Sequence, residues 1–210
     1  MRAAEKLIAE GGMENVSIRE IVNAAGQKNE SALQYHFKSL TGLLRAIHTE
    51  RSEQVQSKRT ELLGDLLKQT AKPELRQLCM IMVQPAFELA RSSLGFRRYV
   101  RAFGHELALA ESSALSQVTS HGGGGLSGQQ LAHLLQNGLP QLDTDIYVQR
   151  MEAAVRLCSS SMYHQARQKN AFRGAQAELF LHSLVDALAG LLSAPMSAET
   201  KDIARSIRTV

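Results

Sequence analysis

Side chains able to hydrogen-bond with DNA are concentrated in one short polar segment. Asn29, Ser31 and Gln34 carry amide and hydroxyl groups, which can pair with adenine or with mixed donor and acceptor edges in the major groove. Lys28, in the polar turn just before them, belongs to the same candidate set. Base contact is therefore one kind of chemistry that these side chains could carry, provided that the segment is presented to a major groove.

A second set of side chains suits the phosphate backbone, which positions a protein on DNA without specifying sequence. Tyr35, His36 and Lys38 follow the first set directly, and Ser17 can begin a helix whose amides face a phosphate. Each has a structural alternative: Tyr35 could pack on the next helix, His36 and Ser17 could cap helices, and Lys38 could be merely solvated. Their joint occurrence favours DNA.

Two competing chemistries are present only as fragments. The run His121-Gly122-Gly123-Gly124 resembles the oxyanion loop of some esterases, but the sequence has no GxSxG nucleophile motif and no strand-rich frame. Cys79, Cys158 and the scattered histidines show no CxxC or HxxxH spacing, so a metal-sensing site is disfavoured. We therefore predict no catalytic residue, no metal ligand and no cofactor, and the isolated cysteines indicate a reducing compartment.

Three short helices are expected in the first fifty residues. Gly11-Gly12 ends a helix over 2–10, Ser17 and Glu20 form a capping box that opens a second, and a third spans 30–37. Short helices joined by glycine-bearing turns predict a helix-turn-helix unit, although a purely structural bundle has the same pattern.

Specific residues add to this pattern. The segments concerned are Ala3–Gly12, Val16–Ile21, Ala24–Gly26, Tyr35–Ser39 and Gly42–Leu44. Together they resemble the DNA-binding domain of the TetR family of bacterial repressors. The resemblance implies a homodimer that binds double-stranded operator DNA and a C-terminal helical domain that receives a small-molecule effector. The step from Gly26 to Phe37 is one residue longer than the commonest family spacing, and a basic N-terminal arm is expected to be short or missing.

The whole chain is expected to be all-α, with a DNA-binding domain at 1–50 and an effector-binding and dimerisation domain at 51–210. Strong helix formers dominate, and period-two runs of β-branched residues are scarce. Thr41 is expected to cap a long connecting helix over about 41–71. Further helices are predicted at 74–92 with a kink at Pro85, 95–119, 128–137, 144–169, 174–194 and 198–207, with a glycine-rich loop over 121–127.

Adaptable apolar side chains in the second domain are candidates for an effector cavity. The candidate wall residues are Met82, Phe87, Phe96, Tyr99, Arg101 and Phe103. Helical spacing alone does not separate cavity wall from core filler. Arg97, Arg101 and His105 also fall at i, i+4 and i+8, where they would either meet an anionic ligand or form an ordinary solvated face.

The last two long predicted helices, 144–169 and 174–194, carry more apolar surface than one bundle layer needs. The family resemblance implies that they form a four-helix bundle with a second copy, where Ala187 and Gly190 would permit close approach. The alternative is that both helices are internal core.

The function expected from the sequence is a repressor that binds an inverted repeat as a dimer and is released by an effector. The alternative is a small-molecule-binding helical dimer without DNA recognition. The net charge of +4 is split evenly along the chain, so geometry rather than a polybasic tail must supply specificity. No run of 18 uninterrupted apolar residues occurs, so a cytoplasmic protein without a membrane partner is expected.

Overall fold

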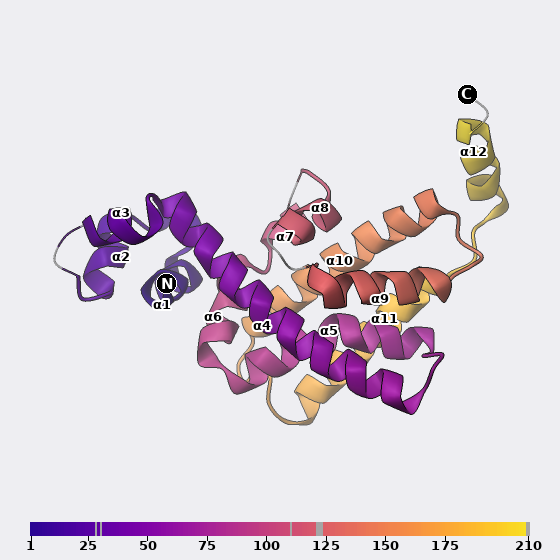
Figure 1. Ribbon diagram of the computed structural model, residues 1–210, viewed down its shortest axis with the longest axis horizontal. Helices are drawn as coiled ribbons and strands as arrows, with labels where there is room; N and C mark the ends of the chain where they lie inside the picture. Colours follow the sequence, from indigo (N-terminus) through magenta and orange to yellow (C-terminus); the bar gives the residue numbers. More distant parts are fainter. Residues whose placement is uncertain (28, 30, 110, 121–123, 209–210) are drawn as a thin grey trace.

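The computed structural model describes residues 1–27, 29, 31–109, 111–120 and 124–208, and all regular secondary structure among them is helical. Figure 1 shows a small N-terminal group of helices at one end of the molecule, joined by one long helix to a larger helical bundle. The all-α prediction is therefore confirmed for the described part of the chain.

The N-terminal unit consists of short helices that end where the sequence predicts. They are α1 (Arg2–Gly11), the 3-10 turn η1 (Met13–Asn15), α2 (Ile18–Ala24) and α3 (Ser31–Phe37). Gly12 has a φ of 83° after α1, a conformation that favours glycine. Ser17 and Glu20 form the expected capping box at the start of α2, which satisfies amides that would otherwise lack partners.

The connecting helix α4 (Leu40–Gln69) begins slightly earlier than expected. Its cap is Ser39, whose hydroxyl accepts a hydrogen bond from the Gly42 amide at 3.0 Å, so the assignment of Thr41 as the cap was wrong. Leu43 and Ile47 at one end of α4 are buried with the N-terminal helices, whereas Leu63 near the other end is buried in the larger bundle. One continuous helix thus contributes to both cores.

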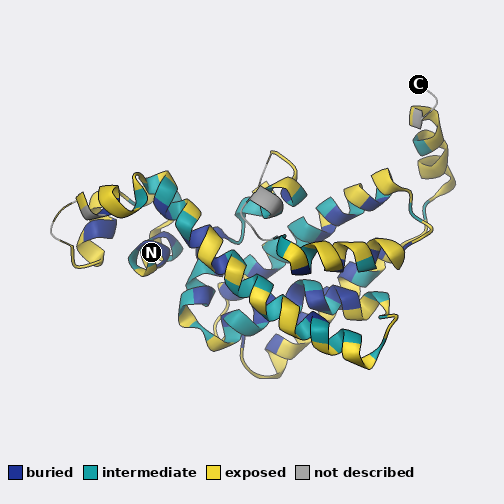
Figure 2. Cartoon of the chain, in the orientation of Figure 1, coloured by how far each residue is buried: buried dark blue, intermediate teal, exposed yellow. Residues whose placement is uncertain are grey.

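The larger bundle begins after Pro73. Its helices are α5 (Leu75–Ser92), α6 (Leu94–Phe103), α7 (Glu106–Leu109), α8 (Ala114–Ser120), α9 (Gly125–Asn137), α10 (Thr144–Ala166), α11 (Gly174–Ser193) and α12 (Ala198–Arg208). Helix α5 runs without interruption through Pro85. Helix α12 projects from the bundle beside the C-terminus and is largely exposed (Figures 1 and 2).

The single helix predicted over 95–119 was wrong, because the chain divides there into α6, α7 and α8. The first break falls at Gly104, where a Cβ atom would lie 3.0 Å from the Cβ of Tyr163 on α10. This close approach requires glycine, which also ends a helix easily. The predicted loop over 121–127 is shorter than expected, since α9 already begins at Gly125; His121, Gly122 and Gly123 lie outside the described residues.

Two buried clusters hold the fold together (Figure 2). The larger one is built around α5, α10 and α11. Leu188 and Leu192 of α11 are fully buried in it. Helix α11 has the length and hydropathy of a membrane-spanning helix, a property it shares with core helices of this kind. The smaller cluster joins α1 to α3 with the start of α4, and it also contains Ala102 and Phe103 from α6.

Candidate DNA interface and effector cavity

Helix α3 presents its polar side chains to solvent. Ser31, Gln34, Tyr35 and His36 are all exposed, while Leu33 is buried and anchors the helix to the N-terminal core. Tyr35 leaves 75% of its surface exposed, so it does not pack on α4. Figure 1 places α2 and α3 at the end of the molecule farthest from α12. A free polar face of this kind can enter a major groove.

Asn29 has a structural partner at the start of α3. Its Oδ1 atom accepts a hydrogen bond from the Ser31 backbone amide at 3.1 Å, as in an Asx turn that begins a helix. This bond occupies one of the two lone pairs of the amide oxygen and fixes the side chain at the start of α3, so Asn29 is a weaker candidate for base contact than Ser31 and Gln34. Lys28 lies outside the described residues.

Ser17 is likewise engaged in capping. The Glu20 amide donates to Ser17 Oγ at 3.2 Å, while the Ser17 amide and hydroxyl donate to the Glu20 carboxylate at 2.8 and 2.7 Å. These bonds from Ser17 hold the pKa of Glu20 below its usual value. Ser17 remains exposed. Its candidate role at a phosphate would depend on the backbone amides at the N-terminus of α2, which Ser17 begins.

The turn between α3 and α4 fixes the angle at which the third helix is presented. Lys38 adopts a left-handed conformation with φ 65°, and its amide donates to the Gln34 carbonyl at 3.1 Å. A Cβ atom on Gly42 would overlap the carbonyl oxygen of Phe37. Glycine at this position therefore allows α4 to start directly against the last residue of α3.

Two exposed cations near these helices were not singled out from the sequence. Arg19 lies in the first turn of α2, and Arg45 lies in the second turn of α4. Both are candidates for phosphate contacts in addition to Lys38. In the sequence, the only indication of such a role was that both arginines belong to helices next to α3. That position indicates a phosphate contact only after the structure shows how the turns place these helices.

A buried ion pair joins the N-terminal unit to the connecting helix. Arg51 Nε and Nη2 donate to the two carboxylate oxygens of Glu5 at 2.7 and 2.8 Å. Both side chains are almost fully buried, and hydrogen bonding to Glu5 raises the pKa of Arg51. Such a two-pronged pair is strongly directional, so it holds α1 on α4 in one orientation.

A second polar cluster lies where α4 meets α6 and α7. His48 Nδ1 lies 3.2 Å from the Tyr99 hydroxyl, and His48 Nε2 lies 3.5 Å from the Glu106 carboxylate. Burial raises the pKa of Glu106 to about 7 and also raises the pKa of Tyr99. The contact with His48 would favour the charged carboxylate, but burial is the stronger effect here.

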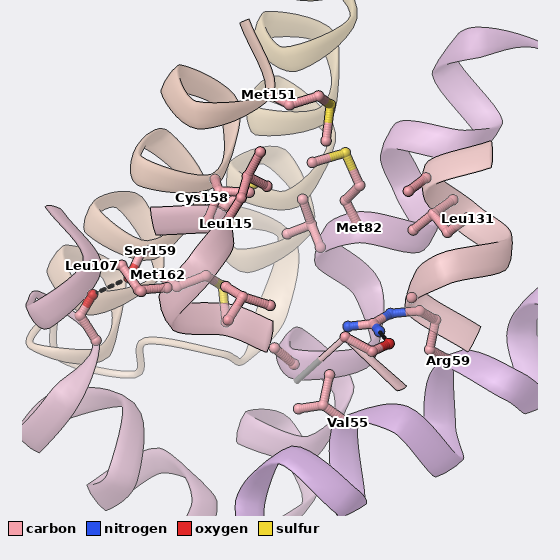
Figure 3. Close-up of a pocket in the computed structure, with 18 of the residues that line it drawn as sticks. Val55, Arg59, Met82, Leu107, Leu115, Leu131, Met151, Cys158, Ser159 and Met162 are labelled. Carbon is pink, nitrogen blue, oxygen red and sulfur yellow. Dashed lines mark hydrogen bonds between the residues drawn. The ribbon is translucent and has the colours of Figure 1, made fainter. Parts of the chain in front are cut away.

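The larger bundle contains a mainly apolar cavity of about 420 Å³ (Figure 3). It lies among α4, α5, α6, α9 and α10, and its wall includes Val55, Met82, Leu131, Met151 and Met162. This volume falls in the range of pockets that enclose drug-sized molecules. The cavity is therefore a candidate effector site.

Four of the six residues proposed for this site line the cavity: Met82, Phe96, Tyr99 and Phe103. Phe87 does not, because it packs in the core against Phe172 and Phe180, with ring centroids 5.5 and 6.4 Å away. Arg101 is exposed at the end of α6. The structure thus excludes Phe87 and Arg101 from the wall, and it adds Arg59, which sequence spacing gave no reason to select.

The proposed cationic face of Arg97, Arg101 and His105 does not form, because α6 ends at Phe103. Arg97 donates to the backbone carbonyls of Ala90 and Arg91 at 3.0 and 3.3 Å. His105 is turned toward Tyr163, with ring centroids 4.9 Å apart. These residues therefore serve packing and helix ends rather than one shared ligand contact.

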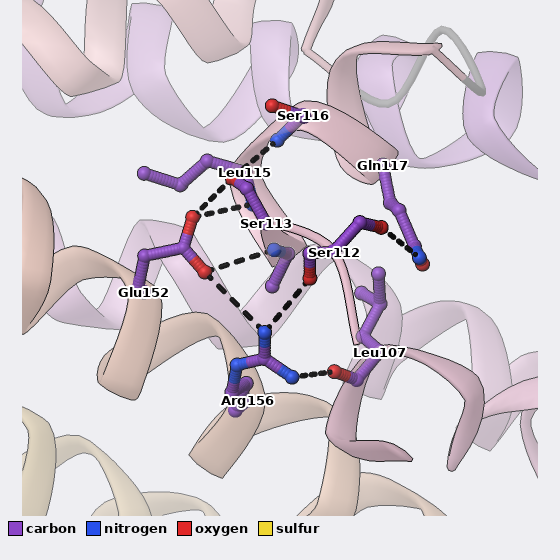
Figure 4. Close-up of polar contacts among 9 residues, drawn as sticks. Leu107, Ser112, Ser113, Leu115, Ser116, Gln117, Glu152 and Arg156 are labelled. Atoms are coloured by element: carbon purple, nitrogen blue, oxygen red, sulfur yellow. Dashed lines mark hydrogen bonds and ion pairs between the residues drawn. The ribbon is translucent and has the colours of Figure 1, made fainter. Parts of the chain in front are cut away.

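The α7–α8 segment over the cavity is tied to α10 by Glu152 and Arg156 (Figure 4). The Glu152 carboxylate accepts bonds from the Ser113 hydroxyl and from the Ala114 and Leu115 amides at the start of α8. Arg156 donates to the carbonyls of Leu107 and Ser112, each at 2.9 Å. Since Leu107 and Leu115 line the cavity, these bonds hold part of its wall.

Cysteine chemistry and metal binding find no support in this arrangement. Burial raises the pKa of both Cys79 and Cys158 to about 12, which disfavours the reactive thiolate form. Among the described residues, no group of three or more His, Cys, Asp or Glu side chains is placed to hold a metal ion.

The arrangement of exposed short helices with a fixed turn and an exposed polar α3 is typical of a helix-turn-helix DNA-binding domain. Residues 1–47 match the model of the bacterial regulatory proteins of the tetR family, which confirms the resemblance seen in the sequence. The N-terminal unit is therefore similar to the DNA-binding domain of these transcriptional regulators.

Other comparisons are more distant. A proposed transcriptional regulator, SCO7518 from Streptomyces coelicolor A3(2), is 17% identical over 91% of this chain and 95% of its own, with a TM-score of 0.45. GusR from Salmonella enterica is 19% identical over 91% and 92%, with a TM-score of 0.44. No curated protein is similar enough to count as a relative. The assignment rests on the N-terminal match.

Proposed function

We propose that the chain is a cytoplasmic repressor that binds an inverted-repeat operator as a homodimer and is released when an effector fills the cavity. The observation that carries this proposal is the double role of α6. Phe96, Tyr99 and Phe103 line the cavity, while Ala102 and Phe103 are buried in the same cluster as Ala4 and Ile8 of α1. One helix is therefore shared by the effector site and the DNA-binding unit.

This shared helix supplies a physical route for release. A molecule that occupies the cavity presses on the Phe103 and Tyr99 side chains, and any shift of α6 carries α1 with it because the two helices pack together. Packed interiors respond to added volume by moving whole elements. Release follows only when the effector binds the DNA-incompetent arrangement more tightly than the competent one.

The dimer is proposed to form through the outer faces of α10 and α11. Leu181, Leu184, Val185 and Leu188 face inward and are buried, so they are core, as the alternative held. The proposed contact face consists instead of exposed residues: Val148, Leu179, Ala187 and Gly190. A Cβ atom on Gly190 would meet nothing within 4 Å, which leaves room for a partner helix.

Two-fold symmetry determines the form of the operator. The paired α3 helices should contact half-sites about 34–36 Å apart, or a multiple of that distance. Gln34, exposed at the centre of α3, is the residue we propose for base contact. Tyr35, His36 and Lys38 are proposed for phosphates.

The test is fluorescence anisotropy of the protein on DNA from upstream of its own gene and on scrambled DNA, across a salt series. We expect selective binding whose log affinity falls linearly with log salt. Gln34→Ala should weaken selective binding by about 1–3 kcal/mol, whereas Gln141→Ala, at an exposed loop position, should not. Equal binding to both DNAs, unchanged by Gln34→Ala, would favour an effector-binding dimer without DNA recognition, an alternative that the capping role of Asn29 supports.

A further inference from the structure

The wall of the cavity has an uneven distribution of charge. Among the described residues that line it, Arg59 of α4 is the only one with a formal charge. Ser159 is engaged with the Gly104 carbonyl, and the Tyr99 hydroxyl is engaged with His48. Figure 3 shows Arg59 on one side of the cavity and Cys158, Ser159 and Met162 on the other. The cavity therefore has one cationic end, and apart from the Gln129 amide the remainder of its wall is mainly apolar.

Arg59 is partly buried at this end of the cavity. Its Nη1 atom lies 3.5 Å from the Gly124 carbonyl, at the outer limit of a hydrogen bond. Burial lowers its pKa, which shows that its surroundings disfavour the positive charge. A nearby anion would reverse that effect.

The start of α9 adds to the positive potential at the same end. Gly124, the N-cap, and Gly128 in the first turn line the cavity, and no side-chain hydrogen bond from the described residues caps the N-terminus of this helix. Gly125 has a φ of 44°, a conformation that favours glycine, and it packs closely against the Gln56 side chain of α4. The close packing places the helix N-terminus, which favours negative charge, beside Arg59.

We propose that the effector is an amphipathic anion: an apolar aliphatic or aromatic body that fills the methionine-lined part of the cavity, with one carboxylate paired to Arg59. This inference rests on the proposed function, since it specifies the ligand of the same cavity. A guanidinium binds a carboxylate through two parallel hydrogen bonds. A neutral molecule of equal size fills the apolar part equally well but leaves Arg59 without a charge partner from the ligand.

The experiment compares matched acid and neutral ligands by isothermal titration at neutral pH. The aliphatic pair is octanoate and 1-octanol, and the aromatic pair is 1-naphthoate and 1-naphthol. We expect at least one acid to bind about ten- to a hundredfold more tightly than its neutral counterpart, as a charge-assisted hydrogen bond implies. Whichever pair shows the larger preference identifies the body as aliphatic or aromatic.

Variants of Arg59 test the residue itself. Arg59→Met should abolish the preference for the acid while retaining affinity for the neutral ligand. Arg59→Lys keeps the charge without the planar fork and should retain part of the preference. Lys68→Met, which removes an exposed cation elsewhere on α4, should leave the preference unchanged. The neutral ligand also reports that each variant still has a folded cavity.

Three results would overturn the inference: equal binding within both pairs, an acid preference that survives Arg59→Met, or no binding of any of the four ligands below about 1 mM. Failure of the proposed function looks different. In that case the acid binds through Arg59, but DNA anisotropy with and without the bound acid is the same.

Discussion

The two glutamates at the junction between the N-terminal unit and the larger bundle lie in opposite surroundings. Glu5 of α1 is buried and receives two hydrogen bonds from Arg51, whereas Glu106 of α7 lies 3.5 Å from His48 and burial raises its pKa to about 7. The Glu5 side of the junction is thus fixed by a directional ion pair. The Glu106 side is weakly paired and adjoins Leu107 of the cavity wall.

This difference indicates which side of the junction an effector can move. A displaced Glu5 would leave Arg51 buried without its carboxylate, which is strongly unfavourable. Glu106 is able to accept a proton near neutral pH, so a change in its surroundings costs less. We therefore expect α7 to move relative to α4 on effector binding, whereas a shift of α6 moves α1 and α4 together, because α1 packs on α6 and is paired to α4.

The largest effect is expected from Glu5→Gln. The substitution leaves the Arg51 charge buried without its carboxylate, so the free energy of unfolding should fall by about 3–5 kcal/mol. Urea denaturation at neutral pH measures this loss. Glu14→Gln, at an exposed position of η1, is the control and should change stability by less than about 0.5 kcal/mol. If Glu5→Gln lost no more stability than the control, the Glu5 side of the junction would not be more firmly fixed than the Glu106 side.

Gly42→Ala tests whether the fixed side extends to the turn before α4. The new methyl group overlaps the Phe37 carbonyl oxygen, and backbone atoms cannot move aside as a side chain can. We expect a loss of about 1–3 kcal/mol together with weaker operator binding, because α3 must tilt. In the same helix, Gly64→Ala meets nothing within 4 Å and should stabilise the chain by about 0.5–1 kcal/mol.

These two results can be read separately. If Gly42→Ala is destabilised but binds operator normally, the turn supports the fold without setting the orientation of α3. If it binds weakly at full stability, the helix has tilted without a loss of core contacts.

Lys38→Gly separates stability from DNA binding on the fixed side. Lys38 has a φ of 65°, which costs a residue with a side chain about 1 kcal/mol relative to glycine. The variant should therefore be more stable by about that amount but should bind DNA more weakly, with the salt slope reduced by about 1 for each monomer. Asn170→Gly relieves the same kind of conformation at φ 58° and should leave DNA binding unchanged. A Lys38→Gly protein with an unaltered salt slope would show that this lysine contacts no phosphate.

The sequence predicts those features that depend on neighbouring residues. The Ser17–Glu20 capping box, the end of α1 at its glycine pair and the exposed polar face of α3 all follow from local spacing. The Glu5–Arg51 pair joins residues far apart in sequence, and neither residue type nor spacing indicates that both are buried.

The wrong predictions in the larger bundle have the same physical origin. The break at Gly104 depends on the approach of Tyr163 from α10, and Phe87 leaves the cavity because Phe172 and Phe180 offer it ring partners. Arg59 becomes a wall residue only because α9 packs on α4 at this point. Periodicity identifies an apolar helix face, but tertiary packing decides whether that face borders a cavity or fills a core.

Glu106→Gln is the smallest expected effect, and its sign should be opposite to that of Glu5→Gln. Folding raises the pKa of Glu106 from 4.5 to about 7. Between these values the folded chain retains a proton that the unfolded chain has released, so stability falls as the pH rises through this window. Glutamine has no such proton to lose. Above pH 7 the variant should therefore gain stability relative to the wild type, by less than about 1 kcal/mol because a third of the side chain is exposed.

Urea denaturation of both proteins at several values between pH 4.5 and pH 8 would measure this divergence. Glu53→Gln, at an exposed position of α4, should run parallel to the wild type over the same range. A Glu106→Gln protein that loses stability above pH 7 would mean that the His48 contact outweighs burial, so that Glu106 acts as a second ion-pair partner. Both sides of the junction would then be fixed, and an effector would have to move α7 together with α1, α4 and α6.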